Sequence, residues 1–442
     1  MYLHGTSAVN ERGNLTIGGM DTTELVKQYG TPLYVYDVSL IRQKARGFVD
    51  TFAKHGMKAQ VAYASKAFCT VAMLQVVEEE GLSLDVVSGG ELYTALQANF
   101  PTERIHFHGN NKSREELEMA LRANIGCIVV DNFYELELLK ELTEQYEQRM
   151  PILLRVTPGV EAHTHEYILT GQEDSKFGFD LQSGGATEAV RRALEAPYLS
   201  LLGVHFHIGS QIFDMTSFHL AAEKVFQCLV QWRDEFEFIS TVLNFGGGFG
   251  IRYTDEDIPA SPAVCVEHII SVAKHFTHIH GMVLPEIWIE PGRALAGDAG
   301  TTLYKVGSTK YIPNVRNYVS VDGGMSDNIR TALYDAKYEA ALANRMKEEK
   351  TELVSVAGKC CETGDMLIWD VTLPSPKAED ILAISCTGAY CYSMASNYNR
   401  LPRPAVVFVE NEEAQVVVER ETYEDIIKFD KAYKSVVRNN ER

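Results

Sequence analysis

The sequence predicts an α/β protein: a closed (β/α)8 barrel followed by a C-terminal all-β domain that N-terminal strands complete. Three observations predict this fold class. Short apolar segments alternate with helical segments over most of the chain, polar residues follow the apolar segments, and strand-like segments with few helices begin after residue 298. A doubly wound open sheet is the competing fold, because alternation alone does not separate it from a barrel.

Eight apolar segments have the composition of strands that are buried on both faces, since each is short and rich in Val, Ile, Leu or aromatic residues. They are residues 61–66, 83–88, 104–109, 126–131, 152–159, 201–210, 242–250 and 286–293. Helical segments lie between them, for example 113–124 and 132–148. Ser113 and Glu116 fit a capping box at the start of the first of these helices. Eight such repeats over about 250 residues are typical of the barrel.

The domain boundaries follow from where the alternation begins and ends. We expect N-terminal strands of the β domain in 1–37, the barrel in 38–298 and the β domain in 299–442. A chain of 442 residues is longer than one compact core usually holds, which agrees with two domains.

Composition and charge exclude several classes of protein. The chain has 41 Lys and Arg against 60 Asp and Glu and carries no basic run, so we expect no nucleic-acid partner. No apolar run is long enough to span a bilayer and the N-terminus lacks the pattern of a secretory signal, so we expect no membrane association. Eight cysteines without CxxC spacing argue against a structural zinc site and favour the cytoplasm.

Polar residues close several predicted strands, at the end of a barrel where active sites lie. Lys66 ends the first strand. A lysine there either extends its amine to the rim or is a buried amine whose pKa falls, ready to react with an aldehyde. The glycines at 246–248 offer backbone N–H groups that can bind a phosphate, although tight turns need glycine too. Their pattern is not GxGxxG, which argues against a dinucleotide site.

His205 and His207 lie on one face of a predicted strand. They suit a metal, or one imidazole suits the face of a flat cofactor, or both are satisfied core histidines. Glu290 is an acid inside an apolar strand, and it needs either a cationic ring nitrogen or a core arginine as its partner. Together with Lys66 and the glycine loop, these residues predict a pyridoxal phosphate site without a metal.

Eight longer motifs follow one another along the chain: YASKAF (63–68), DVVSGGEL (85–92), HIGSQ (207–211), GGGFG (246–250), EPGR (290–293), VDGGMSDN (321–328), GKCCETGD (358–365) and GAYCYSMASNYN (388–399). In this order they resemble the diaminopimelate decarboxylase family, a fold-type III pyridoxal phosphate family related to alanine racemase and ornithine decarboxylase. The resemblance covers nearly the whole chain. The segment HTHEYILTGQEDSKFGF (163–179) resembles the diaminopimelate branch specifically.

The resemblance implies that the barrel binds pyridoxal 5'-phosphate, and it implies a role for each matching residue. Lys66 would bind the aldehyde of the cofactor, His207 would stack on its ring, and Glu290 would face the pyridine nitrogen. The implied cofactor-binding residues are Lys66, His207, Ser210, Gly247, Gly248, Glu290, Gly292, Arg293 and Tyr390.

The resemblance also implies the reaction, in which meso-2,6-diaminopimelate loses CO2 to give L-lysine in the last step of lysine biosynthesis. Lys66 and Cys361 would be catalytic, with the Cys361 thiol returning a proton to the α-carbon. The implied substrate-binding residues are Arg293, Arg330, Tyr334, Glu362 and Tyr390. In this family the Cys-Glu segment reaches into the partner subunit's site, so a homodimer with shared active sites is implied.

Three residues near these positions need their own explanation. Cys360 has no match in the family and is interpreted as a buried packing residue. Thr331 stands where the family has proline, and we expect it to loosen the loop that presents Arg330. Cys391 stands where a small residue such as glycine is expected, and its thiol would lie beside the site, open to oxidation.

Four other functions would each require different residues from those of a diaminopimelate decarboxylase. A decarboxylase of ornithine, arginine or lysine would need an acid in place of the arginine pair. An alanine racemase-like enzyme would need a tyrosine facing the lysine. A metal-dependent barrel hydrolase would use His205 and His207 and leave Lys66 unexplained. A cofactor-free regulatory partner would have lost Lys66 or the glycine loop.

Overall fold

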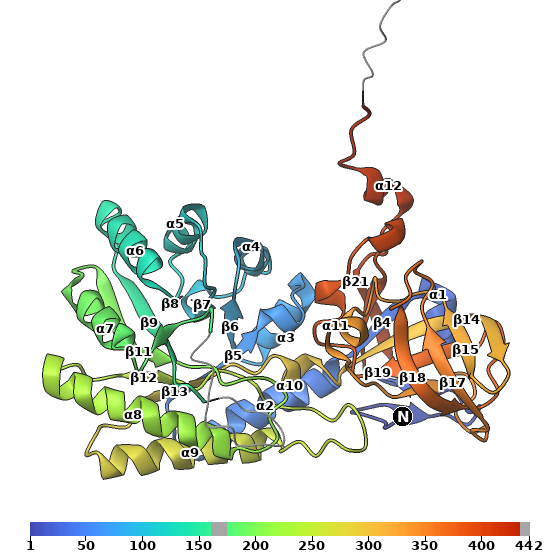
Figure 1. Ribbon diagram of the computed structural model, residues 1–442, viewed down its shortest axis with the longest axis horizontal. Coiled ribbons are helices and arrows are strands. Elements are labelled where there is room, and N and C mark those ends of the chain that lie inside the picture. The colour runs from blue at the N-terminus through green and yellow to red at the C-terminus, as the bar shows by residue number, and fades with distance from the viewer. Residues whose placement is uncertain (161–174, 434–442) are drawn as a thin grey trace, which may run out of the picture.

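The computed structural model describes residues 1–160 and 175–433. Helices surround a parallel sheet in one half of the molecule, and a β-rich half lies beside it (Figure 1). This arrangement confirms the predicted fold class.

Eight parallel strands close into a barrel. Their hydrogen bonds run in the order β9-β11-β12-β13-β5-β6-β7-β8, and β8 pairs again with β9. This last pairing closes the sheet and excludes the open doubly wound alternative. The strands are β5 (Ala59–Ala64), β6 (Ser83–Val86), β7 (Ile105–Phe107), β8 (Cys127–Val130), β9 (Met150–Thr157), β11 (Leu199–His205), β12 (Val242–Asn244) and β13 (Glu286–Ile289), with β10 (Phe179–Asp180) paired beside β9.

Several strands end earlier than the sequence predicts, and the residues beyond β11 and β12 form loops of the site. β12 ends at Asn244, and β11 ends at His205. Gly248 has a φ of 109°, and a Cβ on Gly247 would lie 2.2 Å from the carbonyl oxygen of Glu290. The chain leaves the sheet along a path that only glycine can follow.

Helices cover the outside of the barrel, and their apolar faces pack on the strands to form the main core. They are α2 (Val38–Lys54), α3 (Val71–Glu79), α4 (Gly89–Gln97), α5 (Arg114–Ala123), α6 (Phe133–Gln145), α7 (Gly185–Glu195), α8 (Thr216–Phe236), α9 (Pro262–Ile279) and the short α10 (Arg293–Ala296). The capping box predicted at Ser113 and Glu116 is present at the start of α5. None of the helices in the described parts of the chain is long and apolar enough to cross a membrane.

The second half of the molecule is a β domain. Its strands are β4 (Leu33–Asp37), β14 (Gly300–Ile312), β15 (Arg316–Val321), β16 (Ala340–Leu342), β17 (Glu352–Ala357), β18 (Met366–Leu373), β19 (Ile381–Ser385), β20 (Ala405–Glu410) and β21 (Glu413–Val418). The N-terminal β4 lies between β14 and β20 in this sheet and is followed directly by α2. The N-terminal part of the chain therefore completes the β domain before the barrel begins.

Smaller elements complete the two halves. A separate sheet contains β1 (Ala8–Val9), β2 (Leu15–Ile17) and β3 (Met20–Asp21), and the remaining helices are α1 (Thr22–Tyr29), α11 (Arg330–Tyr334) and α12 (Tyr423–Ile427). Single 3-10 turns occur at η1 (Ser65–Ala67), η2 (Thr102–Arg104), η3 (Tyr392–Met394) and η4 (Tyr398–Arg400).

The β domain contacts the barrel at the carboxyl ends of its strands. The backbone N–H of Tyr390 donates a hydrogen bond to the carbonyl oxygen of Ala67 at 2.8 Å, and the Ser393 hydroxyl donates to the same oxygen at 3.0 Å. The ring of Tyr36, on β4, stacks on Phe68 with centroids 4.3 Å apart. These contacts bring the segment after β19 against the loop that carries Lys66.

Candidate active site

A pocket lies where the barrel strands end. It brings together the nine residues that the sequence assigns to cofactor binding: Lys66, His207, Ser210, Gly247, Gly248, Glu290, Gly292, Arg293 and Tyr390. Ala64 and Asp85 complete its lining. The space between the lining atoms is about 420 Å³, its open mouth included.

Lys66 lies on the 3-10 turn η1, directly after β5. Its neighbours Ser65 and Ala67 are buried, and the Ser65 hydroxyl donates a hydrogen bond to Glu91 at 2.8 Å, so the turn is fixed. The Lys66 side chain itself is exposed at the pocket. Of the two alternatives for this lysine, the exposed side chain agrees with an amine at the rim and not with a buried amine, because the strand ends two residues before Lys66 and the side chain lines the open pocket.

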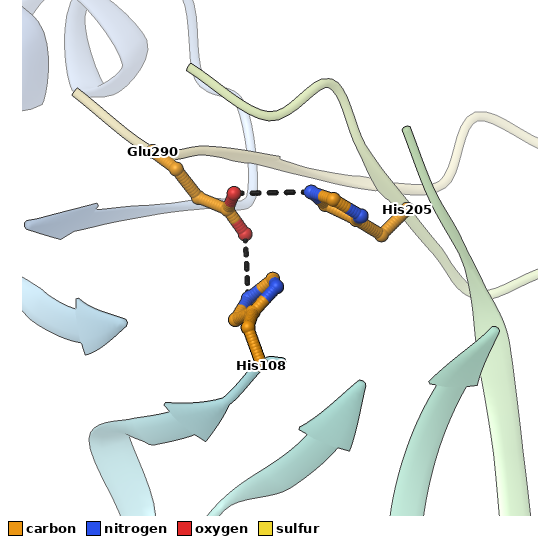
Figure 2. Close-up of side chains that lie close together, drawn as sticks. All are labelled: His108, His205 and Glu290. Carbon is orange, nitrogen blue, oxygen red and sulfur yellow. Dashed lines mark hydrogen bonds and ion pairs between the residues drawn. The ribbon is translucent and has the colours of Figure 1, made fainter. Parts of the chain in front are cut away.

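Glu290 follows β13 and is surrounded by polar partners (Figure 2). Its two oxygens lie 3.1 Å from His205 Nε2 and 2.9 Å from His108 Nε2, and Asn244 donates a further hydrogen bond at 2.6 Å. Burial acts to raise the pKa of Glu290, but His108 and His205 outweigh it and hold this pKa well below its usual value. A buried, ionised carboxylate of this kind is suited to a cationic ring nitrogen.

The histidines at the carboxyl ends of β7 and β11 contribute in different ways. His205 faces Glu290 inside the barrel, whereas His207 lies beyond the strand and lines the pocket. Burial, followed by the nearby Lys66, lowers the pKa of His207 well below its usual value, so the ring is neutral. Its Nδ1 accepts a hydrogen bond from the backbone N–H of Gly247 at 3.3 Å. The sequence reasoning left His108 out of the site, although it lies at the end of a predicted strand.

The pocket also offers unused hydrogen-bond donors. Among the described residues, the backbone N–H groups of Gly248 and Gly292 have no acceptor. The hydroxyl of Ser210 accepts a hydrogen bond from Arg293 at 2.9 Å. Free backbone N–H groups and a hydroxyl are groups that bind a phosphate. With the Lys66 amine, the neutral His207 ring and the ionised Glu290, the residues fit pyridoxal phosphate.

Arg293 and Arg330 both lie against the ring of Tyr390. Their guanidinium carbons are 5.0 and 5.3 Å from its centroid, which joins residues from α10, α11 and the segment after β19. Arg330 is buried. Its guanidinium carbon lies 5.5 Å from the ring centroid of Tyr334, which is 59% exposed. Within the described part of the chain, neither arginine forms an ion pair with a carboxylate. Two cations without acid partners indicate an anionic ligand.

Cys361 and Glu362 are exposed and do not line the pocket of their own chain. They lie in the turn between β17 and β18. The carboxylate of Asp365 braces this turn, because it accepts hydrogen bonds from the backbone N–H groups of Cys360 at 2.7 Å and Met325 at 2.6 Å. The Cys360 side chain is buried, as predicted. The turn is thus fixed while the side chains of Cys361 and Glu362 remain accessible.

The two departures from the family pattern are both buried. Thr331 donates a hydrogen bond to the carbonyl oxygen of Leu367 on β18 at 3.1 Å, so it anchors α11 and does not loosen it. Cys391 is fully buried and does not line the pocket, and burial raises the pKa of its thiol to about 11. The prediction that the Cys391 thiol lies beside the site, open to oxidation, is therefore wrong. Most of the segment at 163–179 lies outside the described residues.

Comparisons with known proteins agree with this geometry. Residues 38–297 match the family described as the pyridoxal-dependent decarboxylase, pyridoxal binding domain. The chain is 64% identical over 438 residues to the diaminopimelate decarboxylase of Bacillus subtilis (strain 168), covering 99% of this chain and 100% of the relative. It is 66% identical over 420 residues to that of Bacillus methanolicus, covering 95% and 97%. The crystal structure of diaminopimelate decarboxylase from M. jannaschii in complex with L-lysine is similar with a TM-score of 0.92 at 35% identity, covering 98% and 99%.

Proposed function

This chain belongs to the diaminopimelate decarboxylase family of pyridoxal-dependent decarboxylases, and from that premise we propose that it converts meso-2,6-diaminopimelate to L-lysine and CO2. It would act as a carboxy-lyase in the last step of lysine biosynthesis through diaminopimelate. One observation carries the proposal: a single pocket joins a lysine, a phosphate-type loop and a buried ionised acid to an arginine that has no acid partner among the described residues.

The pocket residues divide between the parts of pyridoxal 5'-phosphate. The Lys66 amine would hold the aldehyde, Glu290 would keep a proton on the ring nitrogen, and His207 would lie against the ring. The phosphate would be bound by Ser210, Gly247, Gly248 and the backbone at Gly292 and Arg293, with Tyr390 beside the cofactor. When bound, the cofactor supplies an electron sink for the pair of electrons left behind as CO2 departs. This assignment rests on the fit of the donors, the acid and the amine described above.

The arginine pair would select the substrate. Arg293 and Arg330, with Tyr334 and Tyr390, would hold the distal carboxylate of diaminopimelate. Ornithine and lysine lack this carboxylate, and their binding would leave two cations unpaired inside the site. The cost of unpaired charges is far larger than the gain from an extra methylene contact, so the pair gives strong discrimination.

The remaining two residues would act in the site of a second copy. The Cys361 thiol would donate a proton to the α-carbon that has lost CO2, and Glu362 would receive the distal ammonium group. Both side chains are exposed and outside the pocket of their own chain, which supports a homodimer with shared active sites. We also propose a cytoplasmic location, which rests on the cysteine pattern.

A metal is not part of the proposal. His108, His205 and Glu290 could hold an ion, since their ligand atoms lie within 4.8 Å of one another. The imidazoles and Asn244 already contact both oxygens of Glu290, and this contact accounts for its ionised state. The cluster is better explained as the support for the acid that faces the pocket.

The proposal is tested by a lysine-release assay. The purified protein with pyridoxal phosphate is given meso-diaminopimelate, and ornithine, arginine and L-lysine are given in parallel as competing substrates. We expect L-lysine and CO2 from meso-diaminopimelate and no CO2 from the three basic amino acids. Release of CO2 from a basic amino acid, with none from meso-diaminopimelate, would overturn the roles given to Arg293, Arg330 and Glu362.

A further inference from the structure

Behind the arginine pair lies a buried group of three side chains, Tyr253, Tyr338 and Cys391, which we call the tyrosine–cysteine frame. All three are at most 8% exposed. The rings of Tyr253 and Tyr338 meet edge to face, with centroids 5.6 Å apart and an interplanar angle of 82°. Tyr253 accepts a hydrogen bond from Arg293, and Tyr338 accepts one from Arg330 Nε at 3.0 Å. The frame therefore contacts both arginines.

The hydrogen bonds around Arg330 form a closed ring. An arginine Nε only donates, so the Tyr338 oxygen accepts from it and the hydroxyl hydrogen is free to point to Cys391 Sγ, 3.5 Å away. The Cys391 thiol in turn donates to Asn328 Oδ1 at 3.4 Å. That oxygen also accepts the backbone N–H of Arg330 at 3.3 Å, which closes the ring. Cys391 thus connects the guanidinium group of Arg330, through Tyr338 and Asn328, to the backbone N–H of Arg330.

The side chains of the frame are uncharged, so the positive charges of Arg293 and Arg330 remain available to an anionic ligand. Burial raises the pKa of Tyr253 to about 12, although Arg293 and Arg330 act against it, and burial raises the pKa of Tyr338 well above its usual value. Both hydroxyls therefore stay protonated near neutral pH and accept hydrogen bonds without neutralising a guanidinium. A carboxylate in the same place would compete with an anionic ligand, whereas a phenol orients the cation and leaves it unpaired.

We propose that the tyrosine–cysteine frame fixes the spacing and orientation of Arg293 and Arg330, and that Tyr253, Tyr338 and Cys391 are therefore positioning residues for the distal carboxylate of the substrate. This inference rests on the proposed function, because it assigns the arginines to that carboxylate. None of the three side chains lines the pocket, so the frame acts through the arginines. It also gives Cys391, the unexpected residue after Tyr390, a role in specificity.

The first test is Tyr338→Phe in the cofactor-loaded protein. It keeps the ring packing and removes the acceptor for Arg330, so we expect KM for meso-diaminopimelate to rise about tenfold or more, with kcat within about twofold. Tyr253→Phe should act in the same direction through Arg293. The matched control is Tyr36→Phe, which removes an equally buried hydroxyl that donates to Gly388 and contacts neither arginine; its KM should not change.

Cys391 provides a second test that does not depend on one variant folding well. Cys391→Ala opens the ring and should raise KM, whereas Cys391→Ser keeps a donor and an acceptor and should restore KM toward the wild-type value. If Tyr338 acts through Arg330, adding Tyr338→Phe to Arg330→Gln should raise KM no further. An unchanged KM in Tyr338→Phe, or an equal change in Tyr36→Phe, would overturn the inference. A wild-type protein that releases no lysine from meso-diaminopimelate would instead overturn the proposed function.

Discussion

The two halves of the proposed site are built in opposite ways. The barrel half is assembled within one chain, where the residues that follow β5, β11, β12 and β13 meet around one pocket. The Cys361–Glu362 turn of the β domain is held as firmly, by Asp365 and by Asn399, which accepts from the Cys361 N–H at 2.6 Å. The side chains of Cys361 and Glu362 nevertheless remain exposed. One chain therefore has the parts to bind the cofactor, and we expect its proton donor to come from a second copy.

The largest effect is expected at Lys66, in the barrel half. Lys66→Ala removes the amine that would hold the cofactor, and it should abolish lysine release and the absorbance of the bound cofactor. Lys66→Arg is the matched control for charge, because it keeps a cation that is a poor nucleophile, and it should be equally inactive. Wild-type turnover in either variant would show that Lys66 is not the cofactor's attachment point.

The next effect tests whether the β-domain half acts between chains. Cys361→Ala should lower kcat by about 10²–10⁴-fold, the range for losing a positioned proton donor, while cofactor absorbance is retained. Cys360→Ala is the matched control, since the neighbouring thiol is buried.

Mixing the inactive Lys66→Ala and Cys361→Ala proteins sharpens the comparison. If sites are shared, random exchange of subunits gives mixed dimers with one intact site, and roughly a quarter of the wild-type activity should return. Subunit exchange is followed by a tag on one variant. Mixed dimers that form without any return of activity would place both halves of the site in the same chain.

A smaller, pH-dependent effect is expected at Asp85 in the pocket of the cofactor-free protein. Burial raises the pKa of Asp85 from 3.8 to about 6, although His108 opposes the change. The folded chain thus binds this proton more tightly than the unfolded chain does, so the stability it contributes is present below pH 3.8 and is lost as the pH rises through 6. Asp85→Asn removes the titration. The free energy of unfolding of Asp85→Asn should exceed that of the wild type by a larger margin at pH 8 than at pH 5. The two margins should differ by about 1 kcal/mol.

Chemical denaturation at the two pH values measures this difference. Asp255→Asn, at an exposed aspartate, is the control for the loss of a carboxylate at the surface. A gain for Asp85→Asn that is equal at pH 5 and pH 8 would contradict the buried titration.

The smallest effect concerns stability alone. Ser113→Ala breaks the capping box of α5 and should lower the free energy of unfolding by about 1 kcal/mol, with kcat unchanged. Thr422→Ala breaks the equivalent capping box of α12, whose residues include no buried side chain, and it should cost less. Urea denaturation compares the two. A larger loss for Thr422→Ala would mean that α12 packs on something that one chain does not supply.

Much of the fold followed from local patterns because buried parallel strands are short apolar segments and surface helices carry caps. All eight predicted strands are present, and Ser113 caps a helix as its spacing indicated. The strand predicted at 242–250 was too long at its carboxyl end. Phenylalanine among the glycines there gives the segment the apolar composition of a strand. The structure instead has a loop there, because Gly246 and Gly248 take positive φ angles.

For the proposed site, the sequence by itself indicated which side chains would carry chemistry: a lysine, an acid and a glycine loop from their positions at strand ends, and two arginines from the family resemblance. Three facts were decided only by the tertiary structure. Glu290 is ionised because His108 and His205 reach it from other strands, Tyr253 and Tyr338 hold arginines from distant segments, and Lys66 is exposed. The physical reason is that charge state, burial and hydrogen bonding depend on neighbours that meet only when the barrel closes and the β domain docks on it.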